Sequence, residues 1–412
     1  MMPKQLARIL EKHLLKNDGT LPLSTSSEIT LLGRGSVDPI YGGSGSGNVD
    51  TTTCANPKSG LEKAGFSIDS GAYKFFQDNV ASYDKANIVM DKYDQSYFFI
   101  GEIPSSKYSF TVKNSNAAIV FISRAGGEGG DLSTDLVRDS KTSAAQKKIK
   151  DNANTANEVK NYSEGQHQLE LSKEEKDMIT FAENNYSKVV VVVNSSNVME
   201  LGVLNQKGID SVLWIGHPGL TGNKAVAQAI SGKINPSGKL VDCWPYDITT
   251  SPSFASFGPD STLSYSNKSA NFVEYLEGIY VGYRYYVTRA NDDINFKYED
   301  YVQYSFGEGL SYTKFEKYIN DYTVDLVNQK ISIQVAVKNI GNMAGKEVVE
   351  IYNTAPYTSR IEKSHVELVG FEKTNLIEPN ETFFARINID LKSLASWDNE
   401  NGCYLLEKGD YV

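Results

Sequence analysis

Five consecutive valines, VVVVV at residues 189–193, decide the fold, because such a run favours an extended strand that is buried on both of its faces. Three other short apolar runs have the same character and lie at residues 29–32, 117–122 and 211–215. Strands buried on both faces are typical of parallel sheets that carry helices on either side. The four runs therefore predict neighbouring strands of one mostly parallel sheet.

Helical signals lie between these runs, as a layered α/β domain requires. Ser172 and Glu175 form a capping box at the start of a helix whose apolar residues lie on one face. A second helix is expected through residues 225–230, and Gly232 marks its end. Together with the strands, these helices predict a three-layer α/β sandwich with a mostly parallel sheet.

The C-terminal part of the chain has a different period. Apolar and polar residues alternate there, most clearly at residues 331–337 and 383–389. A period of two indicates strands with one buried face, and turn signals such as Glu378-Pro379-Asn380 separate them. The pattern predicts an all-β sandwich of the immunoglobulin or fibronectin type III kind.

These two patterns predict two domains, at residues 1–320 and 321–412. The first domain includes a linker and a polar, charged insertion near residues 132–163, which we expect to lie at the surface. The chain stops at residues 409–412, inside what we expect to be the final strand. That ending suggests a cut or a continuation of the chain.

The composition limits the classes of partner. The chain has 412 residues and a formal net charge of −10, so no basic surplus is present to neutralise phosphates. We therefore expect no nucleic-acid partner and no membrane partner, and we leave the formation of an oligomer open. Charged residues interrupt the first 16 residues, unlike the core of a signal peptide, and no run is long enough to span a membrane. These features predict a cytoplasmic location.

Cysteine usage gives no support for two further kinds of site. Cys54, Cys243 and Cys403 lie far apart and form no Cys-x-x-Cys pair, so neither a disulfide framework nor a zinc site is indicated. We expect reduced, mostly buried thiols. We also expect no metal and no cofactor.

Two glycine-rich segments follow predicted strands, where ligands bind in α/β sheets. The first, YGGSGSG at residues 41–47, lacks the Lys-Ser/Thr ending of a P-loop, and it does not match GxGxxG followed by an acidic partner. The second, SRAGGEGGD at residues 123–131, places Glu128 between glycines, which suits a general acid on a loop. From composition alone, a solvated loop glutamate is the simpler interpretation.

Two tyrosine-rich segments, at residues 275–286 and 304–312, allow two interpretations. Tyrosines at this density can line a carbohydrate site. We prefer the interpretation that they seal the junction between the two domains.

Several longer motifs follow one another along the chain. They are LLKNDGTLPL at residues 14–23, GGSGSG at 42–47, SRAGGEGGD at 123–131, KINPSGKL at 233–240, GIYVGYRYY at 278–286, FGEGLSYTKF at 306–315 and NIGNMAGKEVVEIY at 339–352. In this order the motifs resemble those of the glycoside hydrolase family 3 β-glucosidases. The last motif is similar to the fibronectin type III-like domain of that family.

The resemblance implies a retaining exo-β-glucosidase built from a barrel with an aspartate nucleophile, an α/β sandwich with an acid/base glutamate, and a fibronectin type III-like domain. Its substrates would be β-glucosides or cello-oligosaccharides, cleaved at the terminal non-reducing β-D-glucosyl residue. Because this chain begins at the sandwich, we expect a split or domain-permuted arrangement. The nucleophile would then lie on a barrel that is a separate chain or the rest of a precursor.

The resemblance also assigns residues. Glu128 lies where the SGEGYDR loop of the family places its acid/base, and Ser46 resembles a family serine that hydrogen-bonds the bound sugar. The chain has GGDL where the family usually has YDR, so Glu164, in SEGQHQLEL, is kept as an alternative acid/base. The alternative functions are a β-xylosidase of the same family and a noncatalytic carbohydrate-binding or structural subunit.

Overall fold

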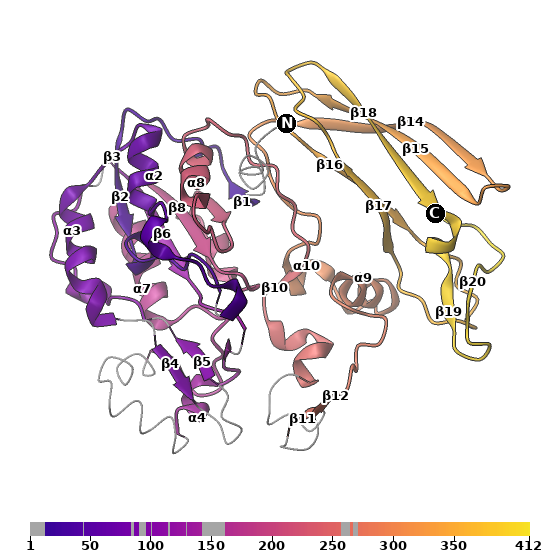
Figure 1. Ribbon diagram of the computed structural model, residues 1–412, viewed down its shortest axis with the longest axis horizontal. Coiled ribbons are helices and arrows are strands. Elements are labelled where there is room, and N and C mark those ends of the chain that lie inside the picture. The colour runs from indigo at the N-terminus through magenta and orange to yellow at the C-terminus, as the bar shows by residue number, and fades with distance from the viewer. Residues whose placement is uncertain are drawn as a thin grey trace. The chain divides into compact units, whose positions relative to one another are not determined.

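A computed structural model describes the chain at residues 13–43, 45–83, 86–89, 96–99, 101–113, 116–128, 130–141, 161–256, 264–266 and 271–412 (Figure 1). The chain forms two compact units. Residues up to Gly238 make up most of the first unit, and most residues from Lys239 to Val412 belong to the second.

The first unit is built on a six-stranded sheet with the order β1-β9-β8-β6-β2-β3. The strands are β1 (His13–Asn17), β2 (Glu28–Leu32), β3 (Ser67–Ile68), β6 (Ala117–Ser123), β8 (Lys188–Asn194) and β9 (Ser211–Trp214). Only the pairing of β1 with β9 is antiparallel among these six strands. The valine run at residues 189–193 is central and fully buried, which confirms the predicted mostly parallel sheet.

Helices cover both faces of this sheet, because successive side chains of β6 and β8 point to opposite faces and nearly all are buried. The helices are α2 (Pro57–Ala64), α3 (Ser70–Asn79), α4 (Leu136–Asp139), α7 (Lys173–Asn185) and α8 (Gly222–Ile230). Figure 1 shows α2 beside α8. The rings of Phe76 and Phe181 both pack against Tyr108, which joins α3 to α7. The predicted capping box is present, with the hydroxyl of Ser172 and the carboxylate of Glu175 each accepting the backbone N–H of the other residue.

The polar insertion near residues 132–163 is only partly described, since residues 142–160 lie outside the described ranges. Its described ends combine exposed residues such as Lys141 with buried anchors. Leu136 is fully buried and Tyr162 is nearly so. Close by, β4 (Ala86–Val89), β5 (Ser96–Phe99) and β7 (Gly130–Asp131) form a second, three-stranded sheet.

The second unit begins with irregular segments and ends in a β-sandwich. Its earlier elements are β10 (Trp244–Pro245), α9 (Tyr283–Asp292), α10 (Tyr298–Tyr301) and β13 (Val302–Tyr304). The paired strands β11 (Ser264–Ser266) and β12 (Asn271–Val273) belong mostly to the first unit. Tyr283 of α9 packs against Phe306 and Tyr352, and its hydroxyl accepts the N–H of Leu368. Tyr283 of the first aromatic segment therefore packs against the sandwich.

The sandwich consists of three small antiparallel sheets. Its strands are β14 (Phe315–Asp325), β15 (Lys330–Asn339), β16 (Val348–Asn353), β17 (Glu367–Lys373), β18 (Thr382–Asp390), β19 (Ser396–Asp398) and β20 (Cys403–Leu405). Val337 of β15, Val349 of β16 and Ile387 of β18 share one core. Phe384 points away from that core and is half exposed, so the predicted alternation is present. Val412 exchanges two backbone hydrogen bonds with Thr354, at 2.7 and 3.0 Å.

Two other predictions concern the domain boundary near residue 320 and the burial of the cysteines. Residues 239–256 and 273–314 group with the sandwich, whereas the sequence placed them in the first domain, and the boundary near residue 320 stays a prediction. All three cysteines are free thiols, but only Cys243 is buried. The expectation of mostly buried thiols is therefore wrong for Cys403, which lies on an exposed hairpin. In the part of the chain that is described, no helix is long and apolar enough to cross a membrane.

The packing of the central strands makes the first unit sensitive to cavities. Ile119 of β6 is fully buried and lies between Leu31 and Val190 on the neighbouring strands. We expect Ile119→Ala to lower the free energy of unfolding by about 2–5 kcal/mol, as measured by urea denaturation. Ile294→Ala is the matched control, because Ile294 is 94% exposed and its loss should change stability by less than about 0.5 kcal/mol. Equal effects of the two substitutions would contradict the assignment of β6 to the core.

Candidate functional site

The two glycine-rich segments predicted from the sequence lie against each other. Gly45–Gly47 forms a short 3₁₀ helix, and Gly45 has a positive φ of 55°. A Cβ at Gly45 would overlap the carboxylate of Glu128, and one at Gly43 would lie 3.3 Å from the carbonyl oxygen of Gly126. Glycine is favoured at Gly45 because its backbone is left-handed and because a side chain there would displace the Glu128 carboxylate.

Ser46 and Glu128 meet at the point where these loops touch. The backbone N–H and the hydroxyl of Ser46 both donate to Oε2 of Glu128, each at 2.9 Å. Because these two bonds favour the charged form, they lower the pKa of Glu128 below its ordinary value. Both residues are exposed. The two predicted site residues are thus brought together from positions 82 residues apart, and their roles stay predictions.

The first loop is held in place by Asn194, at the end of β8. Its side-chain Oδ1 accepts the N–H of Ile40 at 2.7 Å, and its Nδ2 donates to the carbonyl oxygens of Ile40 and Gly216, at 2.9 and 2.7 Å. The hydroxyl of Ser123 also donates to Oδ1, at 3.2 Å. This fully buried amide joins the segments that follow three strands of the sheet.

The second loop is anchored by Arg124, four residues before Glu128. Its guanidinium donates to the carbonyl oxygens of Gln168 and Glu170 at 2.6 and 2.7 Å, and it forms a bidentate ion pair with Glu175. Burial opposes the charge of Arg124, but Glu175, together with Tyr162 and Glu102, outweighs it, so the pKa of the guanidinium is raised. The loop of Glu128 therefore starts from a fixed, buried base and ends in an exposed tip.

Glu164, the alternative acid/base, lies in a different environment. It is in an exposed turn of the segment after the insertion, and its carboxylate accepts a hydrogen bond from Nζ of Lys141 at 3.1 Å. A surface ion pair of this kind contributes little to stability and does not by itself point to catalysis. The geometry thus favours Glu128 over Glu164 as the carboxylate beside Ser46.

The sequence analysis missed three residues at this edge of the sheet: Asn194, Arg124 and His217. Burial lowers the pKa of His217, although a hydrogen bond with the backbone of Arg124 opposes this, so its imidazole is neutral at pH 7. A signal was present for two of them. Asn194 and Arg124 directly follow buried apolar strands, where a polar side chain must find partners inside the protein.

The sequence pattern described as the glycosyl hydrolase family 3 C-terminal domain matches residues 13–283, and a fibronectin type III-like domain matches residues 347–412. The first match covers well over half of the chain and includes both glycine-rich loops. The chain belongs to glycosyl hydrolase family 3.

Relatives of this family 3 chain are β-glucosidases. It is 31% identical to β-glucosidase A of Butyrivibrio fibrisolvens, over 97% of this chain and 47% of that protein. A β-glucosidase of Ruminococcus albus is 30% identical, over 97% of this chain and 37% of its own length. The chain thus spans about half or less of the length of the curated relatives it matches.

Solved structures of the family have the same fold. The β-glucosidase of Paenibacillus barengoltzii superposes with a TM-score of 0.77 at 26% identity, covering 99% of this chain and 40% of that one. β-Glucosidase 3B of Thermotoga neapolitana, solved with glycerol, gives 0.75 at 28% identity, over 98% and 50% of the two chains. The predicted α/β sandwich followed by a fibronectin type III-like sandwich is therefore confirmed.

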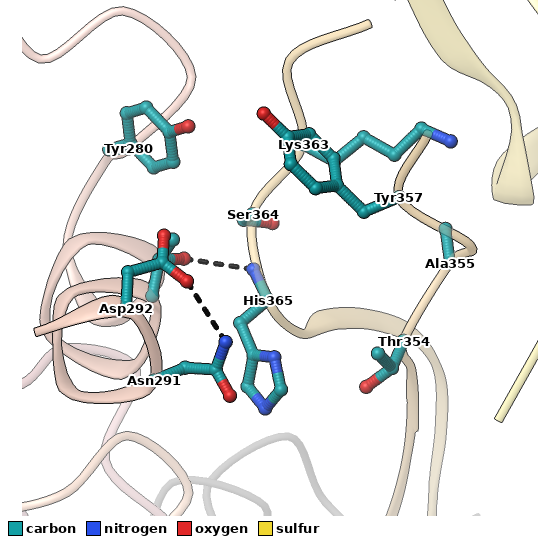
Figure 2. Close-up of a pocket in the computed structure, with 10 residues that line it drawn as sticks. Tyr280, Asn291, Asp292, Thr354, Ala355, Tyr357, Lys363, Ser364 and His365 are labelled. Carbon is teal, nitrogen blue, oxygen red and sulfur yellow. Dashed lines mark hydrogen bonds between the residues drawn. The ribbon is translucent and has the colours of Figure 1, made fainter. Parts of the chain in front are cut away.

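The second unit of this family 3 protein contains a polar pocket of about 110 Å³. Figure 2 shows the hydroxyl groups of Tyr280 and Tyr357 facing one another, with Asp292 and Asn291 on one wall. The amide of Asn291 donates to the Asp292 carboxylate at 2.9 Å. Burial, and then the nearby Glu362, raises the pKa of Tyr280 to about 12, so its hydroxyl keeps its proton at neutral pH. Tyr280 belongs to the tyrosine-rich segment at residues 275–286 that the sequence analysis singled out, whereas the other lining residues were not named there.

The contact between Ser46 and Glu128 can be tested without a substrate. In Ser46→Ala the hydroxyl bond is lost while the stronger influence of the backbone N–H is kept. We expect the pKa of Glu128 to rise toward its ordinary value without reaching it, as measured by ¹³C NMR titration of the glutamate carboxyl groups. Ser27→Ala, at an exposed serine, should leave that titration unchanged. An unaltered Glu128 titration in Ser46→Ala would show that the hydroxyl bond is not formed in solution.

Proposed function

We propose that this chain supplies the acid/base glutamate, Glu128, to a retaining exo-β-glucosidase whose aspartate nucleophile lies on a barrel. The observation that carries the proposal is the meeting of Ser46 and Glu128 at the carboxyl edge of a parallel sheet, where α/β proteins bind ligands. The family's β-glucosidases support the reaction class. β-Glucosides and cello-oligosaccharides are the proposed substrates, and a β-xylosidase is the alternative within the same family.

The proposed reaction needs two carboxyl groups roughly 5 Å apart on either side of the anomeric carbon. The nucleophile attacks that carbon and forms a glycosyl enzyme while Glu128 gives its proton to the leaving oxygen. Glu128, now a carboxylate, then takes a proton from the water that releases the sugar. An exposed loop tip on a buried base suits a group that must reach into an active site completed by another domain.

The protonation state of Glu128 must change during this catalytic cycle. In the chain by itself, the two bonds from Ser46 lower its pKa and favour the carboxylate, which is the form needed for the second step. If the hydroxyl of Ser46 bonds to a sugar hydroxyl instead, Glu128 loses one of these two bonds. Exclusion of water by the sugar would also disfavour the negative charge of Glu128. Both changes raise the pKa and let Glu128 hold the proton it donates in the first step.

Mixing the chain with a barrel-bearing partner and assaying an aryl β-glucoside tests this proposal. We expect a gain in turnover over the partner alone, and Glu128→Gln should reduce cellobiose hydrolysis by this complete enzyme about 10²-fold or more. An activated phenol leaves without protonation, so aryl glucosides should lose less in the first step. Azide should restore their turnover, because a small anion needs no base to attack the glycosyl enzyme.

Glu164→Gln is the matched control for this experiment, because it removes a loop carboxylate that lies outside the Ser46 contact. It should leave cellobiose hydrolysis nearly unchanged and show no azide rescue. Azide rescue in Glu164→Gln together with normal activity in Glu128→Gln would transfer the acid/base role to Glu164. A clear preference for aryl xyloside would overturn the choice of glucoside.

A second candidate function, noncatalytic carbohydrate binding, is favoured by the pocket of Figure 2. Its tyrosines offer aromatic faces, and the Asp292–Asn291 pair offers acceptors and donors to sugar hydroxyls. The one lysine in its lining, Lys363, is neutralised by a buried ion pair with Glu407. The pocket therefore carries no free positive charge from that lysine and suits a small neutral ring rather than an anion.

Saturation-transfer NMR with methyl β-glucoside tests this second function directly. If the pocket binds the sugar, Asp292→Asn should weaken binding roughly 10–100-fold, the effect of losing a charged hydrogen bond. Asp300→Asn, at an exposed aspartate on the neighbouring helix, should have no effect. Binding that survives Asp292→Asn, or no binding at all, would exclude the pocket as a sugar site.

A further inference from the structure

Three metal-ligating side chains converge beside the base of the Glu128 loop. They are His167 and Glu170, on the segment that follows the insertion, and Glu200, on the segment that follows β8. Nε2 of His167 lies 3.0 Å from Oε1 of Glu200 and 3.8 Å from Oε1 of Glu170. All three ligand atoms lie within 4.8 Å of one another.

The two separations from Nε2 of His167 are close to those that a tetrahedral ion imposes on its ligands. Zn²⁺ binds histidine nitrogen and carboxylate oxygen at about 2.0–2.2 Å, which places tetrahedral ligand atoms roughly 3.4 Å apart. The two measured separations from Nε2 lie on either side of that value. The two carboxylates need to approach each other by little more than about 1 Å to complete the geometry.

The backbone around the cluster is already fixed. The N–H of Glu200 donates to the carbonyl oxygen of Leu169 at 3.0 Å, which joins the two segments, and the N–H of His167 donates to the same Oε1 of Glu170 at 3.2 Å. The guanidinium of Arg124 donates hydrogen bonds to the carbonyl oxygens of Gln168 and Glu170. A preformed ligand set of this kind loses little conformational entropy when an ion binds.

Burial of the three groups is graded from inside to outside. The His167 side chain is 6% exposed, that of Glu200 is 16% exposed and that of Glu170 is 27% exposed. An ion could therefore enter past the carboxylates and reach a buried imidazole, and water could fill the fourth position. One nitrogen and two oxygen ligands suit a first-row divalent cation such as Zn²⁺ better than Ca²⁺, which prefers six to eight oxygens.

We propose that His167, Glu170 and Glu200 form a structural site for a first-row divalent cation, with Zn²⁺ as the ion it fits best. The ion would tie the segment after the insertion to the segment after β8, next to the anchor of the Glu128 loop. Because no step of hydrolysis passes through this ion, the site is independent of the proposed acid/base role.

The test is to treat the full chain with a chelator, remove the chelator, and titrate the chain with ZnCl₂. Isothermal titration calorimetry should give one Zn²⁺ bound per chain, and the melting temperature should rise with Zn²⁺ concentration by mass action. His167→Gln and Glu200→Gln should each weaken binding at least about 100-fold, since loss of a group that only supports a ligand already costs 10–100-fold. Co²⁺ in place of Zn²⁺ should give a visible absorption band that both variants lose.

The controls remove the same chemical groups elsewhere. His365→Gln and Glu174→Gln should bind Zn²⁺ like the unaltered chain. Glu170→Gln changes the most exposed ligand and keeps the test decisive if His167→Gln fails to fold. In the presence of chelator, its melting temperature should be close to that of the unaltered chain. No Zn²⁺ binding, or binding unchanged in Glu170→Gln and Glu200→Gln, would overturn the proposal, as would tight binding of Ca²⁺ in preference to Zn²⁺.

Discussion

The side-chain amide of Asn194 is the contact on which the ligand-binding edge of this protein depends. A parallel sheet ends in several loops at one edge, and each loop leaves backbone groups that must find partners. Asn194 bonds both backbone groups of Ile40, the carbonyl oxygen of Gly216 and the hydroxyl of Ser123 from a fully buried position. Because every one of these partners is buried or partly buried, loss of the amide would leave several polar groups without compensation at once.

The ion pair of Arg124 and Glu175 plays a comparable role for the second loop. A charge this deeply buried is tolerated only when it is paired and its remaining hydrogen-bonding positions are satisfied, as those of Arg124 are by carbonyl oxygens. Glu175 also closes the capping box of α7, so one carboxylate joins the start of a helix to the base of the Glu128 loop. The fold and the candidate site share this residue.

These anchors explain how a glycine-rich loop can hold a carboxylate at a defined place. The two loops have rigid, buried bases and small residues at their tips, so the backbones approach closely and Ser46 reaches Glu128. The site that results is polar and open to solvent. Water and Ser46 both favour the charged form of Glu128, so the site presents a carboxylate to the solvent.

The sequence by itself determined the elements and their layers, because strand burial, helix caps and period-two alternation depend on residues within a few positions of each other. The valine run, the capping box at Ser172 and the alternation of β15 and β18 were all evident in this way. Long motifs also identified the family and both glycine-rich loops. Only the tertiary structure decided which loops meet: Ser46 with Glu128, Ile40 with Asn194, and His167 with Glu200. Such contacts join positions 33 to 154 residues apart, and they depend on strand order and on how buried polar groups are satisfied, which no local pattern encodes.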